Sequence, residues 1–242
     1  NESEIFDDLL IFDIPTANWT VIDNKSDMKP TPRFAHASAF LGSQLWIYGG
    51  KSKETYLNDL YCYDFDFHDW WKISTPKTPE PRAWATGFWI PEKIIKSAHS
   101  KEILNSEEEE NVNGNNNNEE IGAYFAIFGG VYKSATYKTI WAFDYDNCNW
   151  IEIETQGDQP PARYSHVSAQ FNNALYVIGG RNSQDTNLDP YRLDMTKNPY
   201  TWTVLPQNDE PNSFDYGTCC VIDDYGLALY SNSLYFIKLK QS

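Results

Sequence analysis

The sequence predicts an all-β protein built from repeated four-stranded antiparallel sheets. Three observations predict this fold. A unit of about 50 residues occurs three times in register, each unit holds four short β-like runs, and a glycine pair stands between the second and third runs. Sheets repeated at this period are typical of a propeller, in which each sheet is one blade around a common axis.

Each unit begins with a proline followed closely by an arginine: Arg33, Arg82 and Arg163. The run before each glycine pair is nearly continuously apolar, which is typical of a strand buried between neighbouring sheets. The pairs are Gly49-Gly50, Gly129-Gly130 and Gly179-Gly180. Glycine permits backbone conformations that are closed to residues with a Cβ, and it leaves room for the adjacent blade.

The third and fourth strands of each unit are predicted from an alternating run and a tryptophan. The run ends at Asp64, Asp144 and Asp194, and we expect each carboxylate to cap the following turn. The tryptophans are Trp70, Trp150 and Trp202. Large aromatic residues pack well on pleated surfaces, so these side chains are predicted to fill the gaps between blades.

The units divide the chain into three full blades flanked by partial ones. Full blades are predicted at residues 30–75, 79–155 and 160–206, and partial blades at 1–22 and 211–240. Two strands, three blades of four and three further strands make 17. Pairing both ends within one blade leaves a strand over for a four-bladed ring, so we expect five or more blades in the parent protein.

An insert delays the glycine pair of the second full blade. It covers residues 91–121 and includes Glu107–Glu110 and Asn115–Asn118. Such a composition favours a disordered loop, and an acidic docking segment is the alternative.

The pattern of proline and arginine, histidine, double glycine, aromatic-Asp and tryptophan over residues 30–205 resembles the kelch repeat. This resemblance implies a kelch-type β-propeller. It also implies that the loop before the first strand and the loop after the glycine pair open on the same face, around the central channel.

Composition and net charge argue against some classes of protein and of binding partner. The chain has 242 residues, of which 9 are Trp, 16 Tyr and 13 Phe, and this aromatic content excludes disorder for most of the length. The net charge of −15 argues against nucleic acid or an anionic membrane as the main partner, and no apolar run is long enough for a membrane helix. Four cysteines without C-x-x-C spacing favour free thiols and a cytoplasmic location.

Enzyme motifs are not found in the sequence. A nucleophile elbow, a phosphate loop and a zinc helix motif are all missing. His36 and His166 share a repeat position that Ala85 and Tyr216 occupy in other units, so a structural role is favoured over metal binding. We therefore expect no catalytic residue, no metal site and no cofactor.

The resemblance points to one face as the binding surface. It would gather the blade-start arginines, the aromatic residues beside them and the loops after the glycine pairs around the channel mouth. The expected site residues are Arg33, Phe34, Lys51, Lys53, Arg82, Trp84, Tyr132, Lys133, Arg163, Tyr164, Arg181 and Asn182. Arginines beside aromatics suit carboxylate-bearing peptides, and bracing of the blades through neighbouring carbonyl groups is the alternative role for the arginines.

These observations predict a non-enzymatic protein-binding module, acting as a scaffold, adaptor or partner receptor. The partner would be a protein or peptide, such as an acidic motif or a chain terminus. Two alternatives remain: a structural subunit held by its edges and insert, and a metal-dependent enzyme of the oxidase or specifier type.

Overall fold

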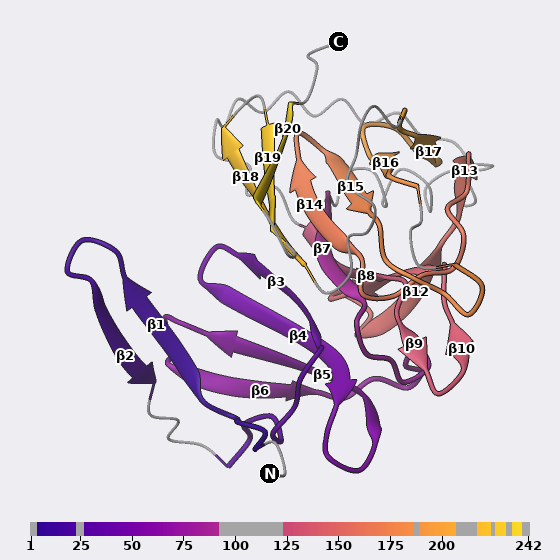
Figure 1. Ribbon diagram of the computed structural model, residues 1–242. Coiled ribbons are helices and arrows are strands. Elements are labelled where there is room, and N and C mark those ends of the chain that lie inside the picture. The colour runs from indigo at the N-terminus through magenta and orange to yellow at the C-terminus, as the bar shows by residue number, and fades with distance from the viewer. Residues whose placement is uncertain are drawn as a thin grey trace, which may run out of the picture.

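The computed structural model describes residues 4–22, 27–91, 123–185, 189–206, 217–223, 226–230 and 234–238. Over these residues the chain forms a series of mainly antiparallel sheets that follow one another in chain order, from the indigo hairpin β1–β2 to the yellow strands β18–β20 (Figure 1). This confirms the all-β fold of four-stranded antiparallel sheets predicted from the repeats.

Two sheets have four strands each. The first has the order β3-β4-β5-β6 and the second the order β12-β11-β8-β7. Their bounds are β3 (Ala37–Leu41), β4 (Gln44–Lys51), β5 (Tyr56–Asp64), β6 (Asp69–Ile73), β7 (Thr86–Pro91), β8 (Ala123–Phe128), β11 (Ile140–Asp144) and β12 (Asn149–Ile153). Consecutive strands pair, so each sheet is a meander that starts at its innermost strand.

The third large sheet has a fifth strand that the sequence did not predict. Its order is β13-β17-β16-β15-β14, and β13 pairs parallel with β17. The bounds are β13 (Thr155–Gly157), β14 (Val167–Phe171), β15 (Ala174–Ile178), β16 (Tyr191–Asp194) and β17 (Tyr200–Val204). The segment that joins two blades therefore also pairs with the outer edge of the next sheet. A Cβ at Gly157 would collide with the carbonyl oxygen of Trp202, so glycine permits this close approach.

Smaller sheets stand at both ends and after one glycine pair. They are the hairpin β1 (Leu9–Asp13) and β2 (Asn18–Ile22), the hairpin β9 (Val131–Tyr132) and β10 (Ala135–Thr136), and the sheet β18 (Thr218–Asp223), β19 (Gly226–Tyr230) and β20 (Leu234–Lys238). The predicted insert lies outside the described residues, except for Pro91.

The first strands of successive sheets lie beside one another at the centre of the arrangement. Strand β3 contacts β7, β7 contacts β14, and β14 contacts β18. The side chain of Gln170 on β14 pairs with the main chain of Trp89 on β7, accepting from its amide at 2.9 Å and donating to its carbonyl at 2.7 Å. The hydroxyls of Thr86 and Ser168 form a short hydrogen bond between the same two strands.

The core lies between sheets, where the repeat tryptophans are buried. Trp70, Trp150 and Trp202 are 6%, 3% and 1% exposed, and each packs against the sheet that precedes it in the chain. Trp150, for example, meets Tyr48 of the preceding sheet at 5.1 Å between ring centroids. The predicted role of the tryptophans is confirmed. Trp19, which precedes Trp70 by one repeat, is instead 67% exposed.

The third strands end in the predicted aspartate turns. Asp64 Oδ1 accepts hydrogen bonds from the backbone amides of Asp66 and Phe67, and Asp144 Oδ1 accepts one from the amide of Asn147. The Oδ1 atom of Asp194 accepts from the amide of Thr196 at 2.9 Å. Capping of the turns by their carboxylates therefore accounts for these recurring aspartates.

Candidate functional site

The blade-start arginines are buried rather than displayed. Arg33, Arg82 and Arg163 are 8%, 2% and 0% exposed. In each, Nη1 donates to the carbonyl oxygen of the first residue of the glycine pair in the same sheet: Gly49 at 3.0 Å, Gly129 at 3.2 Å and Gly179 at 3.0 Å. In each, Nε donates to the carbonyl oxygen two residues before the arginine.

Of the two roles that the sequence left open for these arginines, this geometry favours bracing. Their guanidinium groups join the start of each sheet to the end of its second strand, out of reach of solvent. Desolvation lowers the pKa of Arg82 and lowers that of Arg163 to about 10. Their positive charge still acts on the nearby surface through the poorly polarisable interior.

The backbone after each arginine links neighbouring blades. Ala35, Trp84 and Ser165 occupy the same repeat position, and each has a φ of 54–55°. The amide of Trp84 donates to the carbonyl of Ala35 at 2.8 Å, and the amide of Ser165 donates to the carbonyl of Trp84 at 3.2 Å. This chain of hydrogen bonds fixes the three loops in one row at the same ends of the inner strands.

The glycine pairs complete the contact between blades. The amide of Gly50 donates to the carbonyl of Arg82 in the next sheet at 2.8 Å, and a Cβ at Gly49 would lie 2.7 Å from that same oxygen. Gly129 and Gly130 repeat both features with the carbonyl of Arg163. Close approach of the adjacent blade, together with the positive φ of each pair, accounts for the glycines.

Three aromatic side chains lie ring to ring across the three full blades. The ring centroids of Phe34 and Trp84 are 5.8 Å apart, and those of Trp84 and Tyr164 are 6.3 Å apart. Phe34 is 40% exposed, and Trp84 and Tyr164 are half-buried. We call these three residues the aromatic row. Sequence reasoning placed them on one face, and the structure brings them into contact.

Basic residues border the aromatic row on the loops after the glycine pairs. Lys51 forms a β-bridge with Phe34, and Arg181 forms the equivalent bridge with Tyr164. The Lys51 ammonium lies over the ring of Tyr56 at 5.2 Å, and the Lys133 ammonium lies over the ring of Tyr132 at 5.1 Å. The two tyrosine rings meet edge to face at 5.4 Å.

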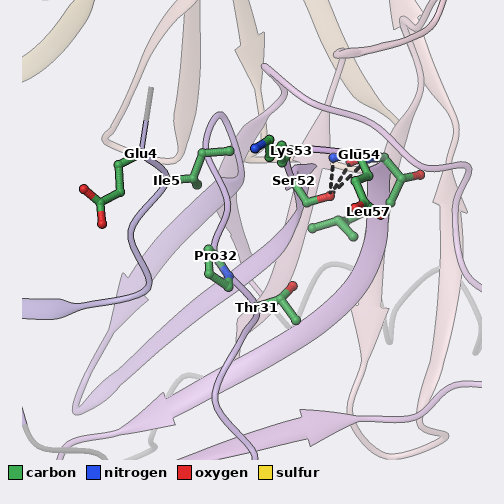
Figure 2. A pocket seen from close by; sticks show the side chains of 9 residues that line it. Glu4, Ile5, Thr31, Pro32, Ser52, Lys53, Glu54 and Leu57 are labelled. Atoms are coloured by element: carbon green, nitrogen blue, oxygen red, sulfur yellow. Dashed lines mark hydrogen bonds between the residues drawn. The ribbon is translucent and has the colours of Figure 1, made fainter. Parts of the chain in front are cut away.

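The structure shows other surroundings for two further predicted residues. Asn182 Oδ1 accepts from the amides of Gln184 and Asp185, both at 2.8 Å, so its side chain caps a turn. Lys53 lies at the tip of the β4–β5 hairpin, beside a pocket of about 760 Å³ that also has Ile5, Pro32 and Leu57 in its wall. Figure 2 shows this pocket between the N-terminal segment and the hairpin tip.

Sequence reasoning missed Tyr56. It lies six residues after Gly50, at the start of the run that becomes β5, and its partner Tyr132 is in a different repeat. The available signal was an aromatic residue within six positions of each of the first two glycine pairs, but nothing in the sequence showed that the two would meet.

The two repeat histidines differ in their surroundings, since His36 is exposed and His166 is half-buried. Both ring nitrogens of His166 are buried without a hydrogen-bond partner, and its ring centroid is 5.4 Å from that of Phe128. Burial lowers the pKa of His166 to about 3 and also lowers that of His36. Within the described ranges, no three His, Cys, Asp or Glu side chains are grouped closely enough to hold a metal ion.

Two further observations concern the free cysteines and the question of membrane-spanning helices. Cys62 is a buried free thiol whose pKa burial raises to about 12, and Cys148 is an exposed free thiol. Over the part of the chain that the structure describes, no helix has the length and apolar character to cross a membrane.

Known proteins resemble this chain in sequence and in fold. A protein from Thlaspi arvense, N-(sulfonatooxy)prop-2-enimidothioate sulfolyase, is 24% identical over 79% of this chain and 49% of its own length. Drosophila melanogaster host cell factor is 27% identical over 64% of this chain and 10% of its own. Mouse kelch domain-containing protein 1 is 34% identical over 35% of this chain and 22% of its own. The chain thus spans half or less of the length of these relatives.

The solved structure of YjhT superposes with a TM-score of 0.60 at 16% identity, covering 88% of this chain and 61% of that one, which shows a shared fold. The family model for the KLHDC2/KLHL20/DRC7 Kelch-repeats domain matches residues 1–101 and 118–231. With the repeat geometry described above and a family match over most of its length, the chain belongs to the kelch-repeat family of β-propellers.

Proposed function

We propose that this chain is a protein-binding module that takes an acidic segment of a partner on the aromatic row and the basic loops beside it. The observation that carries the proposal is the row itself, in which Phe34, Trp84 and Tyr164 lie in contact across three blades and stay partly exposed. Aromatic side chains in contact supply a large and rigid surface at a small cost in side-chain entropy.

Charge supports an acidic ligand. The chain as a whole carries −15, yet the loops that border the row contribute Lys51, Lys133 and Arg181. Beneath the row, Arg82 and Arg163 are buried, and neither forms an ion pair with any described residue. These cations support the binding of an acidic peptide on this face.

In this proposal the blade-start arginines do not contact the ligand, although the sequence included them among the expected binding residues. They hold the loops in place and add long-range positive charge, whereas contact with the ligand falls to the aromatic and basic side chains above them. An adaptor or receptor role, and an intracellular location suited to the free thiols of Cys62 and Cys148, belong to the same proposal.

A peptide-display experiment tests the proposal although the partner is unidentified. The protein is immobilised, random 12-residue peptides are selected on it, and the selected peptides are titrated against Phe34→Ala/Trp84→Ala. Sister repeats carry Ala83 at the position of Phe34 and Ala35 at that of Trp84, so alanine is compatible with both backbones. The matched control is Phe67→Ala/Trp71→Ala, which removes two exposed aromatics elsewhere.

We expect enrichment of acidic peptides whose affinity falls at least about tenfold in the row variant, because two contact aromatics are lost, and stays unchanged in the control. No enrichment of acidic peptides, or equal binding by the row variant, would refute the proposal.

One relative supports an enzyme as the second candidate function. The Thlaspi arvense protein is named as a sulfolyase, and the match covers 79% of this chain. A metal-dependent enzyme, the alternative drawn from the sequence, predicts tightly bound iron or copper, so elemental analysis of the purified protein tests it. Less than about one tenth of an equivalent of either metal after purification in metal-supplemented medium would rule it out.

A further inference from the structure

Four side chains form a compact cluster at the junction of the first two full blades. Lys51 and Tyr56 come from the hairpin between β4 and β5, and Tyr132 and Lys133 from the hairpin between β9 and β10. The order of contact is ammonium, ring, ring, ammonium, with successive separations of 5.2, 5.4 and 5.1 Å. We call these four residues the tyrosine–lysine cluster.

The two lysines of this cluster are held by rings rather than by carboxylates. The ion pairs Lys29–Asp7, Arg33–Asp59 and Arg192–Asp194 involve neither Lys51 nor Lys133. In a chain with 34 acidic residues, a lysine that meets an aromatic face keeps its three N–H donors for another acceptor.

The cluster is continuous with the aromatic row. The main chain of Lys51 is bridged to that of Phe34, with N–H···O distances of 3.0 and 2.9 Å. A peptide lying on the row therefore reaches the cluster at the end of the row that Phe34 forms.

The donor set distinguishes between kinds of anion. A carboxylate is best matched by the planar fork of an arginine, whereas the cations here are two ammonium groups, which act as point charges with rotatable donors. A phosphate monoester carries nearly two negative charges at neutral pH and three acceptor oxygens, so it interacts more strongly than a monoanion with rotatable ammonium donors.

We propose that the tyrosine–lysine cluster binds the phosphate group of a phosphorylated side chain in the partner segment. This proposal rests on the proposed function, because it takes the same face as the docking surface and adds a subsite at one end of it.

Three small probes that differ in charge test the subsite directly. Phenyl phosphate is the dianion, phenyl methyl phosphate is the matching monoanion, and phenylacetate offers a carboxylate on the same ring. Each is titrated at neutral pH into isotope-labelled protein while backbone amide shifts are followed by NMR. We expect phenyl phosphate to bind at least about fivefold more tightly than either monoanion, because the second charge interacts with an ammonium at close range. Shifts should centre on the two hairpins.

The double variant Lys51→Gln/Lys133→Gln removes both ammonium groups. Val131 and Arg181 stand at the repeat position of Lys51, so that site accepts other side chains. The matched control is Lys72→Gln, because the Lys72 ammonium also lies over a tyrosine ring, that of Tyr61 at 5.8 Å, but on strand β6. The preference for the dianion should vanish in the double variant and persist in the control.

Equal affinity for the dianion and the monoanion, or a preference that survives in the double variant, would overturn the subsite. Its failure is distinguishable from failure of the proposed function. Display-selected acidic peptides that bind the aromatic row while no probe prefers the cluster would refute the subsite alone. A dianion preference at the cluster without any peptide binding on the row would refute the proposed function and leave the phosphate site standing.

Discussion

Arg33 and Asp59 form a two-point ion pair, with 2.6 Å between Nη1 and Oδ1 and 3.0 Å between Nη2 and Oδ2. The sister arginines lack such a partner among the described residues. Arg82 stacks on the ring of Tyr137 at 4.1 Å, and Arg163 donates to the carbonyl oxygen of Asp189 at 2.8 Å. The three arginines therefore share their bonds to the glycine-pair carbonyls but differ in their remaining contact. Only the contact of Arg33 is with a carboxylate.

Replacing Asp59 with asparagine should lower the free energy of unfolding by about 2–3 kcal/mol, because a buried guanidinium loses its counter-charge while keeping its carbonyl bonds. Urea denaturation of both proteins measures the difference. Lys29→Gln, which breaks an exposed pair with Asp7, is the control and should leave the midpoint unchanged. An unchanged midpoint in Asp59→Asn would mean that main-chain acceptors suffice for Arg33.

Gly87→Ala should destabilise the contact between the first two full blades. A Cβ at Gly87 would lie 2.5 Å from the carbonyl oxygen and 2.7 Å from the amide nitrogen of Ser38, and backbone atoms cannot rotate away. We expect a loss of about 3 kcal/mol in the free energy of unfolding.

Gly42→Ala is the matched control for that substitution. Gly42 has a φ of +58° with nothing within 4 Å of the added Cβ, so it should lose only the strain of the left-handed region, about 1 kcal/mol. Equal losses at the two sites would show that β3 and β7 can separate without cost.

Acid should destabilise the fold through His166. Burial lowers the pKa of His166 from its ordinary 6.5 to about 3, so between these values the unfolded chain binds a proton that the folded chain does not. The stability is therefore fully present above pH 6.5 and falls as the pH drops, by about 1.4 kcal/mol per pH unit.

The test compares slopes rather than absolute stabilities, because His166→Ala also removes packing against Phe128. The free energy of unfolding should fall less steeply between pH 6.5 and pH 5 in His166→Ala than in the parent. A residual slope from His36, whose pKa is also lowered, is expected in both proteins. Parallel curves would show that His166 already accepts a proton in the folded state.

Trp70→Ala should cost about 3–5 kcal/mol, because it leaves a cavity between the sheet β3–β6 and the hairpin β1–β2. In this 242-residue chain Trp19→Ala should cost far less, since that ring is 67% exposed. The same pair of variants tests the prediction of further blades. If another sheet covers Trp19 in a longer protein, the cost of Trp19→Ala there should approach that of Trp70→Ala.

Most of the sheet architecture could be predicted because it depends on patterns of residues that are close together in the sequence. Apolar runs, glycine pairs and aspartate turns each depend on residues close in sequence, so their spacing marked the strands and turns of the large sheets. Strand β13 could not be found this way, because Thr155–Gly157 becomes a strand only by pairing with Tyr200–Trp202.

The candidate site was less predictable because it depends on which atoms meet across repeats. The sequence left two roles open for Arg163, ligand binding and bracing through carbonyl groups, because it does not show which main-chain oxygens lie within reach of the guanidinium. Tyr56 and Tyr132 are 76 positions apart and meet only because two hairpins of adjacent blades lie side by side. The aromatic row was predictable as a set, since its members follow three repeated arginines.

The outward side of the hairpin β1–β2 has a consequence for the behaviour of this chain in solution. Leu10 pairs with Val21 and Phe12 with Trp19, and all four side chains are exposed on strands that make no further sheet pairing among the described residues. Such a surface attracts copies of itself, while a net charge of −15 keeps the copies apart. Added salt shortens the range of that repulsion from about 8 Å at physiological strength to about 3 Å at 1 M. Colloidal stability should therefore decrease as ionic strength rises, and concentrated samples keep best in dilute buffer.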